Sequence, residues 1–219
     1  MLATLQPIHF LCASVVSGLL AIGCEVIAER RGRRPVLFLL LKPLTSAMIA
    51  GSLLVAAQAP TTLLLAAFVF AIVGDIALMF DGDKAFLAGL SSFFVAHLAF
   101  VAEFAGTITN PSRPPVWTLA FVAYAVLFFR WLLPRTGPLK LPTLAYGIVL
   151  TLMVLAAATA YRTLPGPASA LALAGALVFG LSDSVLAVRQ FVGPYRGAQP
   201  LILGSYWLAI GLIAISRWG

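Results

Sequence analysis

Residues 63–80 have the sequence LLLAAFVFAIVGDIALMF, an apolar run that contains one charged residue, Asp75. A run of this length predicts a membrane-spanning helix. A second aspartate, Asp183, lies in a similar apolar context, in Leu181–Ala187. A carboxylate at membrane depth costs about 2.5–3.5 kcal/mol on insertion scales, so both aspartates are candidates for a functional role. The alternative is that each one caps a neighbouring helix or pairs with a buried lysine.

The composition excludes a soluble domain. Of 219 residues, 62% are hydrophobic and only 10% are charged, and the mean hydropathy is +1.05. A soluble surface needs far more charge. The net charge of +7 does not indicate a nucleic-acid partner, because the basic residues form short clusters between apolar runs. That pattern is typical of topology signals.

The apolar runs and their Pro- and Gly-rich breaks predict an all-α polytopic membrane protein, a single transmembrane domain over residues 1–219 built as an eight-helix bundle. The expected helices are roughly 6–28, 35–57, 61–80, 85–106, 115–133, 140–161, 167–190 and 198–217.

Lys and Arg are distributed unequally between the two sets of connecting segments. One set holds Arg30, Arg31, Arg33, Arg34, Lys84, Arg130, Arg135, Lys140, Arg189 and Arg196. The other set holds Arg113, Arg162 and Arg217. The positive-inside rule assigns the first set to the cytoplasm, so both termini are expected outside, in a bacterial cytoplasmic membrane.

The polar residues of the spans collect near one end. At about 1.5 Å per residue, Lys42, Asp75, Asp183 and Tyr206 lie roughly 8–12 Å from the cytoplasmic helix ends, and His97 about 18 Å. One polar pocket facing the cytoplasmic leaflet is therefore expected. Transporters more often place their site at the midplane, so the asymmetry favours a membrane-embedded enzyme. Glu103 lies near the outer interface, where it is expected to reach water and to be structural.

A weak internal resemblance suggests two four-helix repeats. Asp75 and Asp183 are 108 positions apart, each follows a small residue, and each precedes a leucine by three positions. In the next helices, Ser92-Phe93-Phe94 matches Ser205-Tyr206-Trp207. Four helices per half would give a parallel repeat, with the two aspartates facing each other across its axis.

The motifs of metal, nucleotide and serine chemistry are missing from the sequence. His9 and His97 are the only histidines, so an imidazole-rich zinc site is excluded. A metal held by Asp75, Asp183 and His97 is a disfavoured alternative. There is no P-loop and no nucleophile elbow.

The order and spacing of the polar residues resemble the YhhN-type lysoplasmalogenases, integral membrane hydrolases of lysoplasmalogens. The matching residues are Lys42-Pro43-Leu44-Thr45, Gly74-Asp75 with Leu78-Met79, Phe86, Gly89, Phe93, Ala96-His97, Ser182-Asp183 with Leu186-Ala187, and Tyr206. The chain departs from the family pattern at Ile210, where members often carry glutamine. The resemblance implies cleavage of the sn-1 vinyl ether bond of a lysophospholipid, yielding a fatty aldehyde and glycerophosphoethanolamine or glycerophosphocholine. It implies no metal or organic cofactor.

Vinyl ether hydrolysis begins with proton transfer to carbon and gives an oxocarbenium ion that water captures. The enzyme needs one protonated carboxyl and profits from a second carboxylate, as in glycoside hydrolysis. We expect Asp75 and Asp183 to divide these roles, with the assignment open. His97 and Tyr206 would orient water or the ether oxygen. Lys42 would hold the lipid phosphate, and Ser182 belongs to the expected substrate-binding residues.

Two other functions remain open from the sequence. A proton-coupled small-molecule transporter would use Asp75 and Asp183 as a proton relay. A non-catalytic lipid-binding protein would release its lipid intact. Membrane lipids are the expected surroundings in all three cases.

Overall fold

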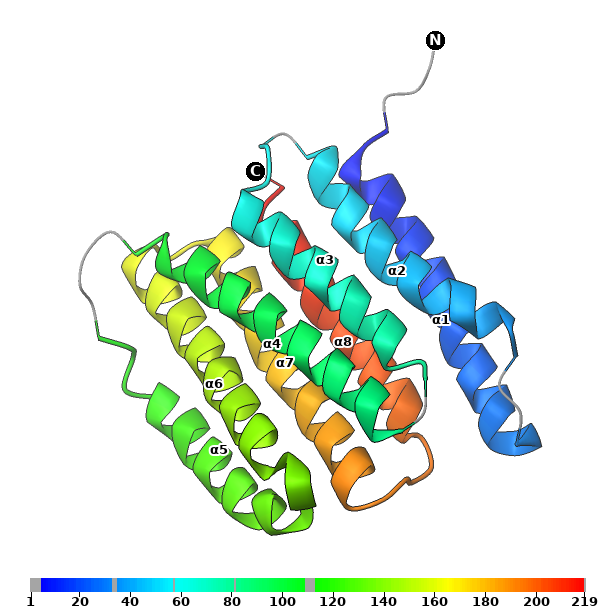
Figure 1. Cartoon of the computed structure of the whole chain (residues 1–219). Coiled ribbons are helices and arrows are strands. Elements are labelled where there is room, and N and C mark those ends of the chain that lie inside the picture. Colours follow the sequence, from blue (N-terminus) through cyan, green and yellow to red (C-terminus); the bar gives the residue numbers. More distant parts are fainter. Residues whose placement is uncertain (1–4, 33–34, 57, 81, 109–112, 219) are drawn as a thin grey trace.

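The computed structural model describes residues 5–32, 35–56, 58–80, 82–108 and 113–218, which form eight α-helices, two short 3-10 helices and no strand (Figure 1). The α-helices are α1 Pro7–Arg31, α2 Leu37–Leu54, α3 Thr62–Ala77, α4 Asp83–Ala105, α5 Thr118–Leu132, α6 Lys140–Thr163, α7 Pro167–Phe191 and α8 Ala198–Ile215. The 3-10 helices η1 Leu133–Arg135 and η2 Gly137–Leu139 join α5 to α6. The predicted all-α bundle is confirmed, and every helix end lies within three residues of its predicted place.

Seven of the helices are long and apolar enough to cross a membrane, and α3 is a shorter apolar helix of 16 residues. At 1.5 Å per residue α3 spans about 24 Å, less than a hydrocarbon core of about 30 Å. Its start is fixed by the Thr61 side chain, which accepts a hydrogen bond from the Leu64 amide at 3.1 Å. The next helix, α4, begins directly after Gly82, whose φ of 103° favours glycine. Asp75 therefore lies two residues before the end of a short helix.

The helices form a bundle in which neighbours along the chain pack in antiparallel pairs, α1 with α2, α3 with α4 and α7 with α8 (Figure 1). α8 also contacts α1 and α2, and α6 contacts α4 and α7. α5 lies at the edge and packs mainly on α6. Three aromatic rings from α4, α7 and α8 meet in the core: Phe93 lies 6.3 Å from Phe179 and 5.6 Å from Tyr206 between ring centroids.

The unequal distribution of cations marks one end of the bundle, called here the basic end. α1, α3, α5 and α7 finish there and α2, α4, α6 and α8 start there (Figure 1). Of the predicted cytoplasmic cations, Arg33 and Arg34 lie outside the described residues. The start of α1 and the end of α8 lie at the opposite end, as the even helix count requires. Which end faces the cytoplasm stays a prediction.

The surroundings of Glu103 differ from the expected contact with water. It is buried, with 5% of its surface exposed, and does not reach water freely. Its Oε2 accepts a hydrogen bond from the Thr61 hydroxyl at 2.5 Å, and its Oε1 lies 3.3 Å from Nη2 of Arg217. A carboxylate in this position costs too much without partners. Glu103 therefore ties the start of α3 and the C-terminal segment to α4, far from the basic end.

The close packing of α7 on α8 depends on Gly175. A Cβ atom there would lie 2.8 Å from the Ala209 carbonyl oxygen and 2.7 Å from Ile213 Cγ1. We expect Gly175→Ala to lower the free energy of unfolding by about 1–3 kcal/mol, because the α8 backbone cannot move away cheaply. Denaturant titration of the purified protein in detergent measures the change.

The matched control is Gly23→Ala in α1, where a Cβ meets nothing within 4 Å. This variant should gain about 0.5–1 kcal/mol from the higher helix propensity of alanine. Equal effects of the two substitutions would contradict the packing argument.

Candidate active site

Asp75 lies in a hydrogen-bonded network that joins α2, α3 and α8. Its Oδ2 accepts hydrogen bonds from the Ser46 hydroxyl at 2.5 Å and from the Tyr206 hydroxyl at 2.9 Å. Lys42 Nζ lies 3.5 Å from Oδ1 of Asp75 and donates to its backbone carbonyl at 2.9 Å. Trp207 Nε1 donates to Ser46 Oγ at 3.1 Å and so orients that hydroxyl. The two charges are thus neutralised locally in a buried ion pair.

The α2 sequence explains this arrangement. Lys42 and Ser46 are four residues apart, so their side chains share one face of the helix. The last carbonyls of a helix have no partner within it, and a lysine can satisfy one of them. Lys42 does this for α3 while it pairs with the Asp75 side chain. From the sequence, pairing with a buried lysine is one alternative for each aspartate, and this pairing is confirmed for Asp75.

Asp183 lies in a second network, formed by α4, α6 and α7. The Tyr146 hydroxyl donates to Asp183 Oδ2 at 2.5 Å, and His97 Nε2 lies 3.7 Å from the same oxygen. No lysine or arginine among the described residues forms an ion pair with Asp183. The Asp183 side chain is 13% exposed, against 3% for Asp75, so Asp183 is the carboxyl that a ligand reaches more easily.

The hydrogen bond of His97 to the backbone determines its tautomer. Nδ1 lies 2.6 Å from the Phe93 carbonyl oxygen, which can only accept, so Nδ1 carries a proton. In the neutral ring Nε2 is then an acceptor, and it has no hydrogen-bond donor among the described residues. Nε2 of His97, 3.7 Å from Oδ2 of Asp183, is therefore placed to accept a proton from that carboxyl.

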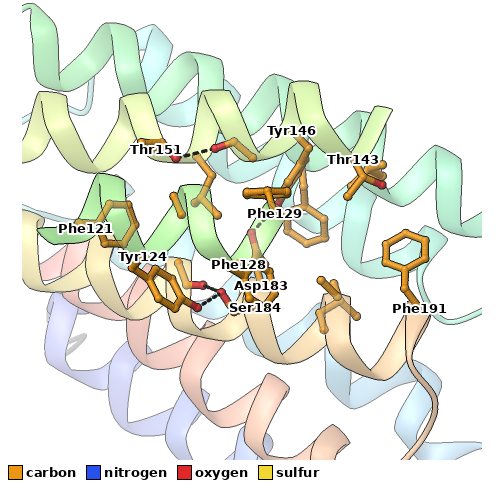
Figure 2. A pocket seen from close by; sticks show the side chains of 18 of the residues that line it. Phe121, Tyr124, Phe128, Phe129, Thr143, Tyr146, Thr151, Asp183, Ser184 and Phe191 are labelled. Carbon is orange, nitrogen blue, oxygen red and sulfur yellow. Dashed lines mark hydrogen bonds between the residues drawn. The ribbon is translucent and has the colours of Figure 1, made fainter. Parts of the chain in front are cut away.

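Two cavities share Asp183 in their linings, and the other residues that they share are apolar. The polar cavity opens at the basic end, has a volume of about 340 Å³, and is lined by Lys42, Asp75, Ser182, Asp183, Arg189, Gln199 and Tyr206 among others. The apolar cavity is a narrow space between α4, α5, α6 and α7, lined by Leu90, Phe121, Phe128, Phe129, Tyr146, Leu150, Gly180 and Asp183 among others. Figure 2 shows Asp183 and Tyr146 among the aromatic side chains of the apolar cavity.

The structure brings most of the predicted site residues together. Lys42, Asp75 and Tyr206 share one network, and His97 and Asp183 share the other. Ser182 borders the polar cavity, but its hydroxyl donates to the Ile202 carbonyl of α8 at 3.0 Å and serves a helix–helix contact.

Sequence reasoning missed Ser46 and Tyr146. The position of Ser46, one helical turn after Lys42, was a usable signal. Tyr146 gave none, because its bond to Asp183 depends on how α6 packs against α7.

The structure does not support a metal site formed by Asp75, Asp183 and His97. Asp75 belongs to a different network from Asp183 and His97. In the described part of the chain, no three His, Cys, Asp or Glu side chains come close enough to hold a metal ion.

The two networks are related in a way that the predicted repeat requires. Asp75, on α3, takes its partners from α2 and α8, and Asp183, on α7, takes its partners from α6 and α4. A two-fold relation between the halves exchanges α2 with α6, α3 with α7 and α4 with α8. Phe93 and Tyr206, which occupy matched positions, pack edge to face with an interplanar angle of 87°. The repeat itself stays a prediction, and its two copies of the site differ chemically.

The helices and the buried carboxylates define a multi-pass membrane protein with a polar site inside the bundle. Comparison with known sequences names the family: the model of the YhhN family matches residues 37–217, and the chain belongs to that family.

Two relatives are proteins named lysoplasmalogenase TMEM86B. The chain is 35% identical to the one from Homo sapiens and 33% identical to the one from Mus musculus, in each case over 71% of this chain and 63% of the relative. The matched region thus spans less than two thirds of the length of these curated relatives. No solved structure matches the chain.

The ion pair between Lys42 and Asp75 gives a stability prediction. We expect Lys42→Met to lower the free energy of unfolding by about 3–5 kcal/mol, because it leaves the buried carboxylate without its counter-charge. The double variant Lys42→Met/Asp75→Asn should recover much of this loss, because it leaves no charge to neutralise. Denaturant titration in detergent measures the wild type, both single variants and the double variant.

Lys84→Met, at an exposed position of the basic end, is the matched control and should change the stability by less than about 0.5 kcal/mol. Additive losses in the double variant would contradict a direct pairing.

Proposed function

We propose that the protein is a lysoplasmalogenase, which hydrolyses the sn-1 vinyl ether bond of a lysoplasmalogen to a fatty aldehyde and glycerophosphoethanolamine or glycerophosphocholine. The observation that carries the proposal is the junction of the polar and apolar cavities at Asp183. In a lysoplasmalogen the vinyl ether lies at the boundary between a polar headgroup and a single hydrocarbon chain. The names of the relatives support the same substrate.

The linings of the two cavities, one polar and one apolar, suit the two halves of this lipid. The apolar cavity is walled on one side by Phe121, Phe128 and Phe129 of α5, the edge helix with few tertiary contacts. A chain from the surrounding bilayer can enter beside such a helix. The polar cavity opens at the basic end and receives the glycerophosphate. The positive-inside rule assigns this end to the cytoplasm, so the substrate would come from the cytoplasmic leaflet.

The reaction has three steps. A carboxyl proton moves to carbon 2 of the alkenyl chain, and the carbon–carbon double bond becomes an oxocarbenium ion at carbon 1. Water adds to carbon 1 and returns a proton to the carboxylate, which gives a hemiacetal. The hemiacetal then breaks its bond from carbon 1 to the glycerol oxygen, which takes a proton as the aldehyde forms. One water molecule is consumed and the acid is regenerated.

The arrangement of partners favours Asp183 as the acid. It lines both cavities, it is the more exposed carboxyl, and it faces the acceptor Nε2 of His97. Tyr146 orients the carboxyl through its hydroxyl, and His97 accepts or returns the proton.

Asp75 lines the polar cavity and is held by Ser46, Tyr206 and Lys42. It stabilises the developing positive charge and, with Tyr206, positions the water. Lys42 balances its charge in the resting state.

Substitution of the proposed acid tests this assignment. We expect Asp183→Asn to keep the fold, because an amide still accepts the Tyr146 bond, and to lower kcat by at least about a hundredfold through loss of the transferable proton. Aldehyde release from a lysoplasmalogen in detergent micelles measures kcat. The control is Glu103→Gln, a buried carboxyl at the far end of the bundle, which should keep kcat within about twofold. Full turnover by Asp183→Asn would refute the role.

Isotope incorporation distinguishes hydrolysis from the transporter and lipid-binding alternatives. Turnover in D₂O should yield an aldehyde with one deuterium at carbon 2, because the proposed proton transfer is to that carbon. The saturated alkyl-ether analogue should bind without cleavage, since it has no double bond to protonate. An aldehyde standard incubated with Asp183→Asn in D₂O controls for later exchange. Recovery of intact lipid, or uptake into vesicles without cleavage, would overturn the proposal.

A further inference from the structure

Three polar side chains at the mouth of the polar cavity have no part in the chemistry proposed above. Arg189 lies in the last turn of α7, lines the cavity, and forms no hydrogen bond or ion pair with any described residue. The bundle thus places a half-buried guanidinium beside open space. Lys42, the cation expected from the sequence to hold the lipid phosphate, is already paired with Asp75.

The second side chain is Gln199, in the first turn of α8. Its Oε1 atom is buried and accepts no hydrogen bond from the described residues. A buried amide oxygen without a donor costs about 1–3 kcal/mol, so such an atom beside a cavity points to a ligand that donates to it. The third side chain, Asp83, begins α4 and adds a negative charge at the same mouth.

We infer that Arg189, Gln199 and Asp83 form a headgroup subsite that binds phosphoethanolamine in preference to phosphocholine. The inference rests on the proposed function for its substrate class. Arg189 binds the phosphate, because a planar guanidinium offers two parallel N–H donors to phosphate oxygens. Gln199 accepts a hydrogen bond from the primary ammonium, and Asp83 attracts its charge.

The distances along α7 suit this lipid. Arg189 follows Asp183 by six residues, about 9 Å along the helix axis, and helical side chains lean back toward the N-terminus. Arg189 is about 120° around the helix from Asp183, and both side chains line the polar cavity. In the substrate, five bonds separate the ether oxygen from phosphorus, roughly 6 Å if three backbone bonds span 3.8 Å. A vinyl ether at Asp183 thus places its phosphate within reach of Arg189.

The preference for ethanolamine follows from the orphan oxygen of Gln199. An ethanolamine ammonium carries N–H groups that can donate to it, and a choline trimethylammonium carries none. The choline lipid would leave Oε1 buried and without a donor, as it is in the free protein. One hydrogen bond of ordinary net strength predicts a KM ratio of roughly five- to tenfold between the two lipids.

The test compares KM for ethanolamine lysoplasmalogen, choline lysoplasmalogen and 1-alkenylglycerol, which lacks phosphate. Arg189→Gln should raise KM for both phospholipids by about ten- to a hundredfold and leave 1-alkenylglycerol unchanged. Arg189→Lys should recover part of the loss. The matched control is Arg196→Gln, an exposed arginine at the same end that does not line the cavity. Gln199→Leu should bring the ethanolamine-to-choline ratio close to one.

Binding of the saturated alkyl-ether analogues separates this inference from the proposed reaction. The ethanolamine analogue should raise the thermal unfolding midpoint of the wild-type protein at lower concentration than the choline analogue, and Gln199→Leu should remove the difference. If this preference is found and no vinyl ether is cleaved, the proposed reaction fails and the subsite stands. The subsite is overturned if Arg189→Gln affects 1-alkenylglycerol as strongly as the phospholipids, if Arg196→Gln has the same effect, or if Gln199→Leu leaves the ratio unchanged.

Discussion

The burial of Asp75 in hydrocarbon is the constraint around which the helices are arranged. A carboxylate at that depth must be neutralised and hydrogen-bonded, and no single helix offers enough partners. Asp75 obtains them from Lys42 and Ser46 on α2 and from Tyr206 on α8. This one carboxylate therefore fixes the depth of α2 and α8 relative to α3. Because α3 is short, the network lies beside an open mouth at the basic end.

The second carboxylate meets the same constraint differently. Asp183 has a phenol and an imidazole as partners and forms no ion pair with a described lysine or arginine. Asp75 is thus paired with a lysine and Asp183 is not, and the two aspartates lie on helices that a two-fold relation would exchange. This chemical difference between similar sites supports one acid and one electrostatic partner in the proposed hydrolysis.

Much of the fold and part of the site could be predicted from particular residues. Long apolar runs separated by Pro and Gly leave only helices as spanning elements, since backbone groups in lipid must be satisfied internally. Asp75, Asp183 and Lys42 were recognisable because charge is expensive there. Glu103 was misjudged: its depth predicted contact with water, but Thr61 and Arg217 cover it. Contacts made by the C-terminal segment have no signal in local sequence.

The sequence by itself determined the number of helices, their approximate ends and the presence of two aspartates within apolar helices, because these follow from local hydropathy and the cost of charge in hydrocarbon. Only the tertiary structure decided which groups meet. The pairing of Tyr146 with Asp183, and the junction of a polar and an apolar cavity at that residue, depend on the packing of α6 and α7. Helix packing in lipid is set by shape and by a few polar contacts between distant residues, and a hydropathy pattern carries neither.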